Sequence, residues 1–419
     1  MQRNLQLARH LGEAGWRPLV ITGPGPVDYR WTPEDPALGI RLDAEVVRLS
    51  GPEPTPGPWE TRFERWLRTP THWRRWWRDG VLRAAAAASE VDVVHASVAP
   101  YATAAAAADV ALLLGKPLVL DFEDPWALDE MLVYPTRAHR RLELRRMGRA
   151  LRPAAAIVMN TPEARRRVLA AFPGLGPPRV RSIQNAFDPL DFEEPPPQRA
   201  DGRFRIVHTG SLHTELGLRH RAERRRRRLL GGAVGGVDFL TRSHVYLLEA
   251  VEAVARDEPE AAATVEVVLA GVFTEDDRAV ASRYPFVRLC DFVPHAQTIG
   301  LIRSADLLFL PMHDLPAGCR AAIVPHKTYE YLASGRPLLA AVPDGDARDL
   351  LEAAGSPRLC RPADTVAMAE IVREEITRKH AGERPAPPDP EVVRRCGSDR
   401  LVRELTALYE GLAASASGV

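Results

Sequence analysis

The 419-residue chain is long enough for two domains of ordinary size, each with its own apolar core. Its 56 basic and 55 acidic residues leave a formal net charge of +1, so no global field attracts nucleic acid or repels a membrane. Only Lys116, Lys327 and Lys379 among the basic residues are lysines, so the many arginines by themselves carry little information about function.

The four cysteines lie far apart, without the paired spacing of a zinc site or a disulfide framework: Cys290, Cys319, Cys360 and Cys396. We therefore expect no metal site and a reducing, cytoplasmic setting. The first residues, MQRNLQLARHL, lack the apolar core of a signal peptide. No apolar run reaches the roughly 18 residues that a membrane-spanning helix needs.

In the first half of the chain, short β-branched or leucine-rich runs alternate with longer helical stretches, as in a parallel sheet covered on both faces. A helix is expected at 3–14, where Leu7, Leu11 and Ala14 form one apolar stripe. The alanine-rich run at 102–115 predicts another packed helix. The expected strands are 18–22, 45–49, 91–96, 117–122, 154–160 and 179–183.

A proline-rich segment then predicts a linker between two domains. The alternation resumes after it, with expected strands at 205–208, 265–271, 287–293, 306–311 and 337–342, and a last helix from about 390 to 413. The predicted division is an N-terminal domain at 1–187, a linker at 188–202, a C-terminal domain at 203–383, and a linker with a helix at 384–419. We expect two Rossmann-like α/β domains facing a central cleft, in which ligands bind at the carboxyl ends of the strands.

The segment VPHKTYEYLASGRPLLA at 324–340 is the most informative part of the chain. Pro325 stands at the start of a predicted short helix that Gly335 ends before the next strand. A helix start offers free backbone N–H groups and a positive dipole end to a diphosphate, and Lys327 adds a positive charge. Glu330, one turn further, can accept hydrogen bonds from both ribose hydroxyls of a nucleotide. The segment therefore predicts a nucleotide-diphosphate site.

This loop, helix and strand resemble the donor site of the retaining GT-B glycosyltransferases of family 4 (glycosyl transferases group 1), and the resemblance extends over most of the chain. HTGSL at 208–212 is similar to the glycine-containing loop that opens the family's second domain, and SADLLFLP at 304–311 to the strand before the donor motif. DVVHAS at 92–97, GKPLVLDFEDPW at 115–126 and SIQNAFDPLDF at 182–192 are similar to strands of its first domain and to its interdomain asparagine motif.

The resemblance implies the transfer of a hexosyl group from a nucleotide-diphosphate sugar, with retention and without a metal ion or cofactor. The acceptor is a glycan, a lipid-linked molecule or a small molecule, as in polysaccharide biosynthesis. Arg242 and Lys327 are implied to stabilise the leaving diphosphate, and Glu330 matches the second glutamate of the family's paired-glutamate motif. The other implied residues are Gly210, Ser211, Val324, Pro325 and His326 on the donor side, and His95 and Trp126 on the acceptor side.

The chain departs from the family pattern within two motifs. The first glutamate of the pair is replaced by Ala322, in the P-x-K-x-x-E form of the motif that several branches share. The first domain's usual histidine has no counterpart, and Glu123 and Asp124 stand at the end of the matching strand instead. These carboxylates can orient or deprotonate an acceptor hydroxyl. Alternatively, Asp124 caps the turn before Pro125 while Glu123 is solvated.

A further departure concerns the beginning of the N-terminal domain. The family's first strand and glycine-rich loop should precede the helix at 3–14, so we expect the first central strand of this sheet to be missing. Neighbouring strands would then have unpaired edges. A native start about 20 to 25 residues upstream, roughly a strand and a loop, would supply it.

The stretch at 63–80 is basic and aromatic, with Trp66, Trp73, Trp76 and Trp77 among Arg65, Arg68, Arg74, Arg75 and Arg78. Such a helix can rest on an anionic membrane surface, which would suit a lipid-linked acceptor and a peripheral position at the inner membrane face. Alternatively, its tryptophans pack on the sheet.

Two charged motifs invite other interpretations. RHRAERRRRR at 219–228 is similar to a nucleic-acid-binding patch, but the chain is neutral overall and has no recognised binding module, so we expect an insertion near the cleft and no nucleic-acid partner. DGD at 344–346 could hold a metal ion, but Asp346 is better placed to cap the helix that follows.

Two further functions stay open. A nucleotide-sugar epimerase of the same fold would need an acid and a base beside the sugar, for which only Glu123 and Asp124 are candidates. A non-catalytic relative that binds a nucleotide sugar would be compatible with Ala322 and with the missing strand.

Overall fold

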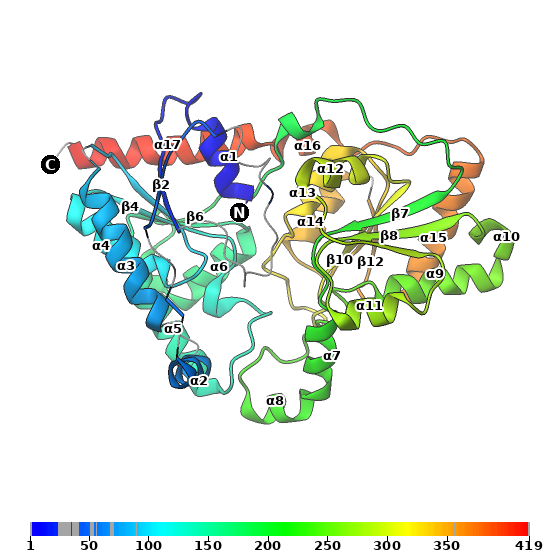
Figure 1. The fold of residues 1–419 in the computed structure, drawn as a ribbon, viewed down its shortest axis with the longest axis horizontal. Helices are drawn as coiled ribbons and strands as arrows, with labels where there is room; N and C mark the ends of the chain where they lie inside the picture. The colour runs from blue at the N-terminus through cyan, green and yellow to red at the C-terminus, as the bar shows by residue number, and fades with distance from the viewer. Residues whose placement is uncertain are drawn as a thin grey trace.

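The computed structural model describes residues 2–23, 35, 42–50, 54–55, 57–67, 71–88, 90–355 and 357–417. The chain forms two α/β halves, each built on parallel strands, and Figure 1 shows them side by side. This architecture confirms the predicted fold class.

The N-terminal half contains a two-stranded and a four-stranded parallel sheet, the latter in the order β3-β4-β5-β6. Its strands are β1 (Leu19–Thr22), β2 (Glu45–Arg48), β3 (Val94–Ser97), β4 (Leu118–Phe122), β5 (Ala156–Met159) and β6 (Val180–Ser182). Its helices are α1 (Gln2–His10), α2 (Pro58–Leu67), α3 (Thr71–Ala86), α4 (Thr103–Leu114), α5 (Arg137–Leu151) and α6 (Pro162–Ala171), with 3-10 turns η2 (Trp126–Leu128), η3 (Pro173–Leu175) and η4 (Pro189–Phe192). β4 and β5 are buried along their whole length, as a continuous apolar run in a covered parallel sheet requires.

The sheet of this half is interrupted. Within the described residues, β1 is hydrogen bonded only to β2, and β3 only to β4. Ile21 of β1 and Val94 of β3 nevertheless pack on one apolar cluster, which Val81 of α3 and Val110 of α4 also form. The two sheets therefore share a helical layer.

Helix α1 is fixed to the carboxyl ends of these strands by a buried arginine. The side chain of Arg3 is 1% exposed, and its Nε lies 2.6 Å from Asp121 Oδ2. Its Nη1 donates to the carbonyl of Gln184 and to Asn185 Oδ1. A buried charge needs such a set of partners, so the position of α1 depends on Asp121 and on the segment around Asn185.

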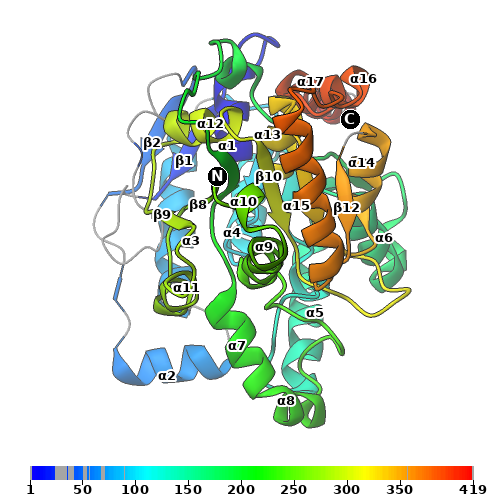
Figure 2. The same ribbon diagram turned by 90° about the vertical axis from the view of Figure 1, so that its right-hand side faces the viewer.

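The C-terminal half is a six-stranded parallel sheet in the order β12-β11-β10-β7-β8-β9. Its strands are β7 (Phe204–Thr209), β8 (Val265–Ala270), β9 (Val287–Cys290), β10 (Leu307–Pro311), β11 (Leu338–Ala341) and β12 (Arg358–Cys360). Its helices are α7 (Thr214–Ala222), α8 (Arg224–Leu230), α9 (Val245–Asp257), α10 (Pro259–Ala262), α11 (Glu275–Ala281), α12 (His295–Arg303), α13 (Lys327–Ser334), α14 (Asp346–Ala354) and α15 (Thr365–His380). Figure 2 shows α9 and α15 together in front of this sheet, and one apolar cluster joins them to β7, β8 and β10.

The end of the chain returns to the N-terminal half. Helices α16 (Pro390–Arg395) and α17 (Ser398–Ser417) follow the proline-rich segment, and Figure 1 shows α17 in red beside α1. Leu401, Leu405 and Tyr409 of α17 pack with Leu7 of α1 and Val119 of β4. The core of the first half is thus completed by residues far away in the sequence.

The predicted helix at 63–80 is divided between α2 and α3. Trp73 stacks on Trp77 at a ring-centroid distance of 5.3 Å, and Trp76 and Trp77 pack on the apolar cluster around Val81. The sheet-packing interpretation therefore holds for Trp76 and Trp77 of α3. Trp66 of α2, in contrast, is 60% exposed.

A buried carboxylate joins the two halves. Glu130, which is 1% exposed, follows η2, and its Oε1 accepts hydrogen bonds from His313 Nε2 at 3.1 Å and from the backbone N–H of Ala322 at 3.0 Å. Its Oε2 accepts from Arg167, whose guanidinium also donates to the carbonyl of Arg320 at 2.6 Å. Thr161 Oγ1 donates to the carbonyl of Ala322 at 2.6 Å. The loop before α13 is thus held by side chains of the other half.

Burial acts to raise the pKa of Glu130, but His313, Arg167 and the Ala322 N–H more than compensate and lower it to about 2. A carboxylate whose pKa is depressed by folding stabilises the fold above its ordinary pKa, and this stabilisation is lost as the pH falls toward 2.

We predict that Glu130→Ala lowers the free energy of unfolding by about 3–5 kcal/mol at neutral pH, because it leaves buried His313 Nε2 and the N–H of Ala322 without their acceptor and removes one of the two carboxylates that pair with Arg167. Glu130→Gln keeps an acceptor oxygen and should cost less. Urea titration followed by circular dichroism measures both.

The matched control is Glu352→Ala, which removes an exposed pair with Arg348 (2.9 Å) and should cost less than about 1 kcal/mol. Equal stabilities of the Glu130→Ala and Glu352→Ala proteins would contradict the role given to Glu130.

Candidate functional site

The segment singled out in the sequence forms the predicted loop, helix and strand. Helix α13 runs from Lys327 to Ser334, and Gly335 ends it in a left-handed conformation with φ +64°, as predicted. His326 precedes the first turn without a side-chain capping bond. The N–H groups of Thr328 and Tyr329 in this turn donate to the backbone carbonyls of Pro325 and His326, at 2.9 and 3.1 Å.

Lys327 lies against the loop that follows β7. Its Nζ is 3.2 Å from His208 Nε2, and His208 Nδ1 is 3.0 Å from the carbonyl of Phe309. Since Nδ1 must donate to that carbonyl, Nε2 accepts from the lysine and the imidazole is neutral. A Cβ on Gly210 would stand 3.0 Å from Nζ, and φ here is +96°, so a glycine is required for this close approach. The lysine and the glycine loop thus form one site.

Two cationic groups share this site. Burial, together with the charge of Arg242, lowers the pKa of Lys327 to about 7. Burial also lowers the pKa of Arg242, while Asp124, Asp129 and Glu130 of the other half oppose that effect. Two neighbouring cations repel each other in a poorly solvated place, so an anion between them would be stabilised by both.

Glu330 lies in the first turn of the same helix and is 9% exposed. Its Oε1 is 3.7 Å from His326 Nδ1. Although burial acts to raise the pKa of Glu330, His326, His295 and Lys327 together lower it. The side chain is therefore an anionic hydrogen-bond acceptor, as hydroxyl recognition requires.

The first half contributes an acidic and aromatic wall. A pocket of about 230 Å3 is lined by residues 98–101 with Glu123 and Asp124. Tyr101 in its wall stacks on Trp126 with a ring-centroid distance of 4.8 Å. Trp126 is itself 5% exposed, and its Nε1 donates to Glu143 Oε1 at 2.9 Å. The predicted catalytic residues Glu123 and Asp124 thus border a pocket, with the predicted acceptor-side residue Trp126 behind it.

The carboxylates of this wall are hard to ionise together. The side chain of Asp124 is exposed, but many protein atoms surround it and reduce its solvation. This reduced solvation raises the pKa of Asp124. The charge of Arg242 opposes the rise, and Glu123 and Glu130 add to it. Burial and Asp124 raise the pKa of Asp129 to about 7. A carboxyl group with a raised pKa beside a pocket is suited to proton transfer near neutral pH.

The other predicted residues lie at various distances from this centre. Ser211 follows Gly210 and is exposed, whereas Val324 and Pro325 are buried in the loop before α13. His95 lies on β3 with Nδ1 2.8 Å from the hydroxyl of Tyr409 and Nε2 3.5 Å from Asp121. Both partners are buried, which gives His95 a structural environment.

Sequence reasoning missed four residues of the site. His208 and His213 face the cations, and burial with Arg242 and Lys327 lowers the pKa of His213 to about 3. Asp129 and Tyr101 belong to the opposite wall. His208 begins the HTGSL motif and could have been found there, whereas the other three carry no local signal.

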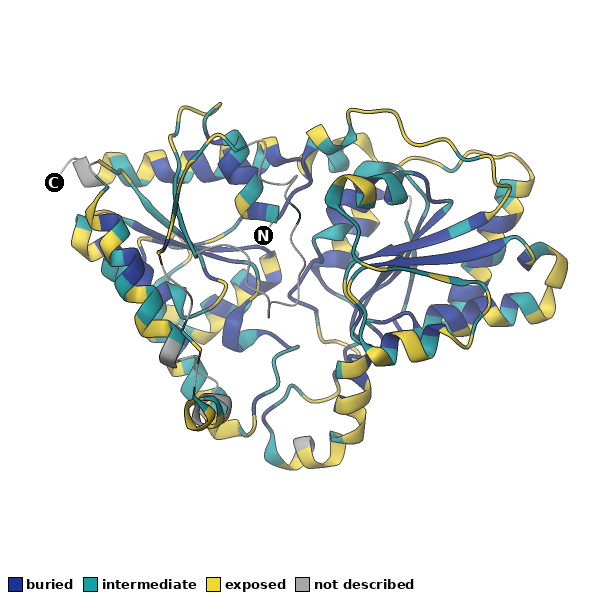
Figure 3. Ribbon diagram, viewed as in Figure 1, coloured by how far each residue is buried: buried dark blue, intermediate teal, exposed yellow. Residues whose placement is uncertain are grey.

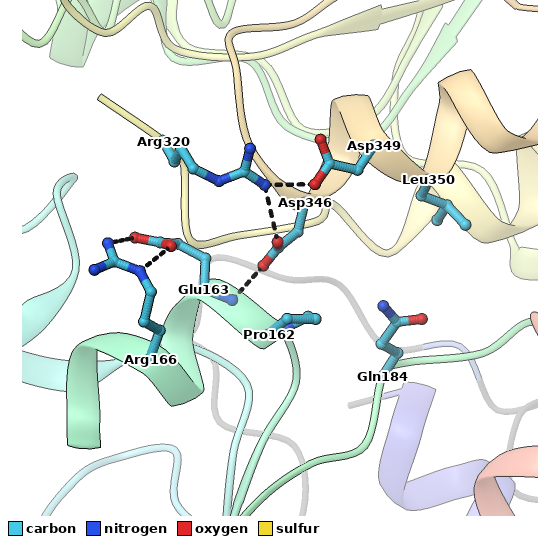
Figure 4. Close-up of a pocket in the computed structure, with 8 residues that line it drawn as sticks. All are labelled: Pro162, Glu163, Arg166, Gln184, Arg320, Asp346, Asp349 and Leu350. Carbon is cyan, nitrogen blue, oxygen red and sulfur yellow. Dashed lines mark hydrogen bonds and ion pairs between the residues drawn. The ribbon is translucent and has the colours of Figure 1, made fainter. Parts of the chain in front are cut away.

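A larger pocket, of about 410 Å3, lies between the halves and is drawn in Figure 4. Asp346 corrects the prediction of a helix cap: Gly345 is the N-cap of α14, and Asp346 Oδ2 instead accepts from the N–H of Glu163 at 2.7 Å, in the first turn of α6. Arg320 joins Asp346 and Asp349, and Arg166 pairs with Glu163. Asp346 thus caps a helix of the other half, and we assign no ligand to this pocket.

Comparison with known proteins identifies similar sequences and folds. Residues 2–189 match a family model described as Glycosyltransferase Family 4. No curated protein matches the sequence. Anabaena HepE in complex with UDP-glucose superposes with a TM-score of 0.57 at 14% identity, covering 98% of this chain and 96% of that one.

Two further structures are similar. The α,α-trehalose 6-phosphate synthase of Burkholderia multivorans has a TM-score of 0.57 and 13% identity, covering 96% of this chain and 98% of that one. A candidate UDP-N-acetylglucosamine 2-epimerase of Listeria monocytogenes has a TM-score of 0.55 and 14% identity, covering 97% and 91%. Residues 2–189 therefore match a glycosyltransferase family 4 model, and the chain as a whole has the GT-B fold.

Proposed function

We propose that the protein is a glycosyltransferase that moves a hexosyl group from a nucleotide-diphosphate sugar to a hydroxyl acceptor. The observation that supports this most is the pair of cations, Arg242 and Lys327, next to the start of α13 and opposite the acidic wall of the first half. A leaving diphosphate needs positive charge where its own charge develops. The HepE structures contain UDP and UDP-glucose, so uridine is the first base to test.

On the donor side, the diphosphate lies between Lys327 and Arg242, and Glu330 accepts hydrogen bonds from the ribose hydroxyls. Gly210 leaves the room for the phosphates beside the lysine. Because the two side chains supply the positive charge, we propose that transfer needs no metal ion or other cofactor, and that chelation of divalent cations leaves the rate unchanged.

On the acceptor side, the hydroxyl enters the pocket beside Glu123 and Asp124. The bond between the anomeric carbon and the diphosphate oxygen breaks, the acceptor oxygen bonds to that carbon from the same face, and Asp124 takes the hydroxyl proton. Configuration is retained in this proposal. A glycan, a lipid-linked molecule or a small molecule are the candidate acceptors, with polysaccharide biosynthesis as the process.

We also propose a cytoplasmic location, peripheral at the inner membrane face. Among the described residues, no helix combines the length and the apolar character that crossing a bilayer requires. Contact through residues 63–80 is part of this proposal, although the tryptophans of α3 pack inward.

The second candidate function is a nucleotide-sugar epimerase, which the likeness to the Listeria structure favours. Both enzymes would use the same donor site. A panel of nucleotide sugars, with and without acceptors, separates them: release of nucleotide diphosphate that depends on acceptor indicates transfer, and a free epimer without release indicates epimerisation. Binding without turnover would indicate a non-catalytic relative.

We predict that Lys327→Ala and Glu330→Ala each reduce acceptor-dependent UDP release at least about 100-fold, since each removes an interaction with the donor. Lys379→Ala is the matched lysine control. Lys379 pairs with Asp306 outside the candidate site, so this variant should keep full activity. Undiminished activity of both site variants would refute the assignment of the donor site.

We predict a pH dependence of UDP binding that originates in Lys327. Its pKa of about 7 in the free protein must rise when a diphosphate binds, so binding takes up a proton at pH 8. Affinity should be full below pH 7 and fall up to about tenfold per pH unit above it. Calorimetry in buffers of different ionisation enthalpy measures the uptake.

Lys327→Arg is the control for this titration, because an arginine stays charged over the whole range. The proton uptake should disappear in this variant even if binding is weaker. Equal proton uptake by both proteins would assign the titration to another group.

A further inference from the structure

The positive charge of this chain is concentrated on two helices. Helices α5 and α8 contain eleven arginines and one glutamate, although the formal net charge of the whole chain is only +1. On α5 the exposed arginines recur every four residues, at Arg137, Arg141, Arg145 and Arg149. Such spacing places them along one side of the helix. A local field of this strength attracts polyanions that the neutral chain as a whole does not.

These arginines have few acidic neighbours. Arg224, Arg225 and Arg226 on α8 are exposed, and within the part of the chain that the structure describes no ion pair joins them or the four exposed arginines of α5 to a carboxylate. The single glutamate of α5, Glu143, is occupied by Trp126 and Arg146. The charge is therefore available to a partner.

A third helix adds aromatic side chains to the same surface. On α2, Trp59, Arg62 and Trp66 stand at positions i, i+3 and i+7, which is one face of a helix. The two tryptophans are 79% and 60% exposed, and Leu229 of α8 is 85% exposed. These exposed apolar side chains lie on the same helices as exposed arginines, so the surface is both basic and apolar.

The three helices form one continuous surface that includes both halves of the molecule. The ring of Trp66 contacts His139 in the first turn of α5, with centroids 5.3 Å apart. The N–H of Tyr134, just before α5, donates to the carbonyl of Gly232, just after α8, at 3.0 Å. Figures 1 and 2 place α2 and α8 at the same end of the molecule, and Figure 3 shows both largely exposed.

We propose that α2, α5 and α8 form a docking surface for an anionic lipid bilayer. Arginines bind the lipid phosphates, while indole rings enter the interface between headgroups and acyl chains. Charge alone would fit any polyanion, but the exposed tryptophans and Leu229 favour a partner with an apolar phase beside its anionic groups, which a bilayer provides. This surface differs from residues 63–80 because it excludes the packed tryptophans of α3 and includes α5 and α8.

The experiment is flotation of the purified full chain with vesicles of phosphatidylcholine, with or without phosphatidylglycerol, in the absence of nucleotide sugar. Its outcome is thus independent of the proposed transfer. We expect binding only to the anionic vesicles, and weaker binding at high salt, since the screening length falls from about 10 Å at 0.1 M to about 3 Å at 1 M.

Two sets of variants divide the surface into its parts. Trp59→Ser with Trp66→Ser should weaken binding at least about tenfold, because two indoles lose their contact with the bilayer. Arg224→Gln, Arg225→Gln and Arg226→Gln together should weaken it by a similar or larger factor, at about fivefold for each arginine near an anionic surface. Thermal unfolding verifies that each variant is folded.

Matched controls replace an exposed apolar side chain and three exposed arginines elsewhere on the molecule. Leu112→Ser removes a side chain that is 83% exposed on α4, and Arg256→Gln, Arg394→Gln and Arg395→Gln remove three exposed arginines of α9 and α16. Both control proteins should bind like the unaltered chain.

Absence of vesicle binding, or binding that the two sets of variants leave unchanged, would overturn the proposal. Binding to heparin that depends on the arginines but not on the tryptophans, without vesicle flotation, would do so as well and would point to a soluble polyanion.

Discussion

The carboxylate of Glu130 is 1% exposed and ionised, so the surrounding groups must supply what water would otherwise provide. Those groups come from both halves of the molecule: Arg167 from one, His313 and the N–H of Ala322 from the other. The remaining residues of the candidate site belong either to the first half or to the second. Because the contact is made to the loop that leads into α13, the position of the helix is set by the first half as well as by its own sheet.

The same contact explains the alanine at the position of the family's first glutamate. Ala322 is fully buried, and its methyl group belongs to the apolar cluster of the first half, with Trp126 and Ala127. A glutamate here would place a second carboxylate in that cluster, near the one of Glu130, and such a pair cannot ionise together without a large cost. The carboxylate next to Ala322 is therefore supplied by Glu130 of the first half. Under the proposed function, interactions with the donor sugar come from other atoms of the loop.

Much of the fold could be predicted because its strands are apolar runs bounded by polar segments. Each of the eleven expected strands overlaps an observed one, and the strand that was missed, β12, has three residues and begins with Arg358. Lys327 and Gly210 could be found because they lie in motifs with fixed spacing. Arg242 was found through the resemblance alone, since nothing in its local sequence indicates that it faces Asp124.

What could not be predicted depends on contacts between distant segments. Asp346 looks like the cap of its own helix but binds the first turn of α6, because the two halves meet there. Tyr101 and Asp129 gain their environment only when η2 and the turn after β3 come together. The arginines of α5 and α8 form a single surface only because Tyr134 and Gly232 are hydrogen bonded across the two halves. Local sequence determines the helices and strands. The charges around a side chain such as Arg242 depend in addition on contacts between the halves, which bring Asp124, Asp129 and Glu130 near it.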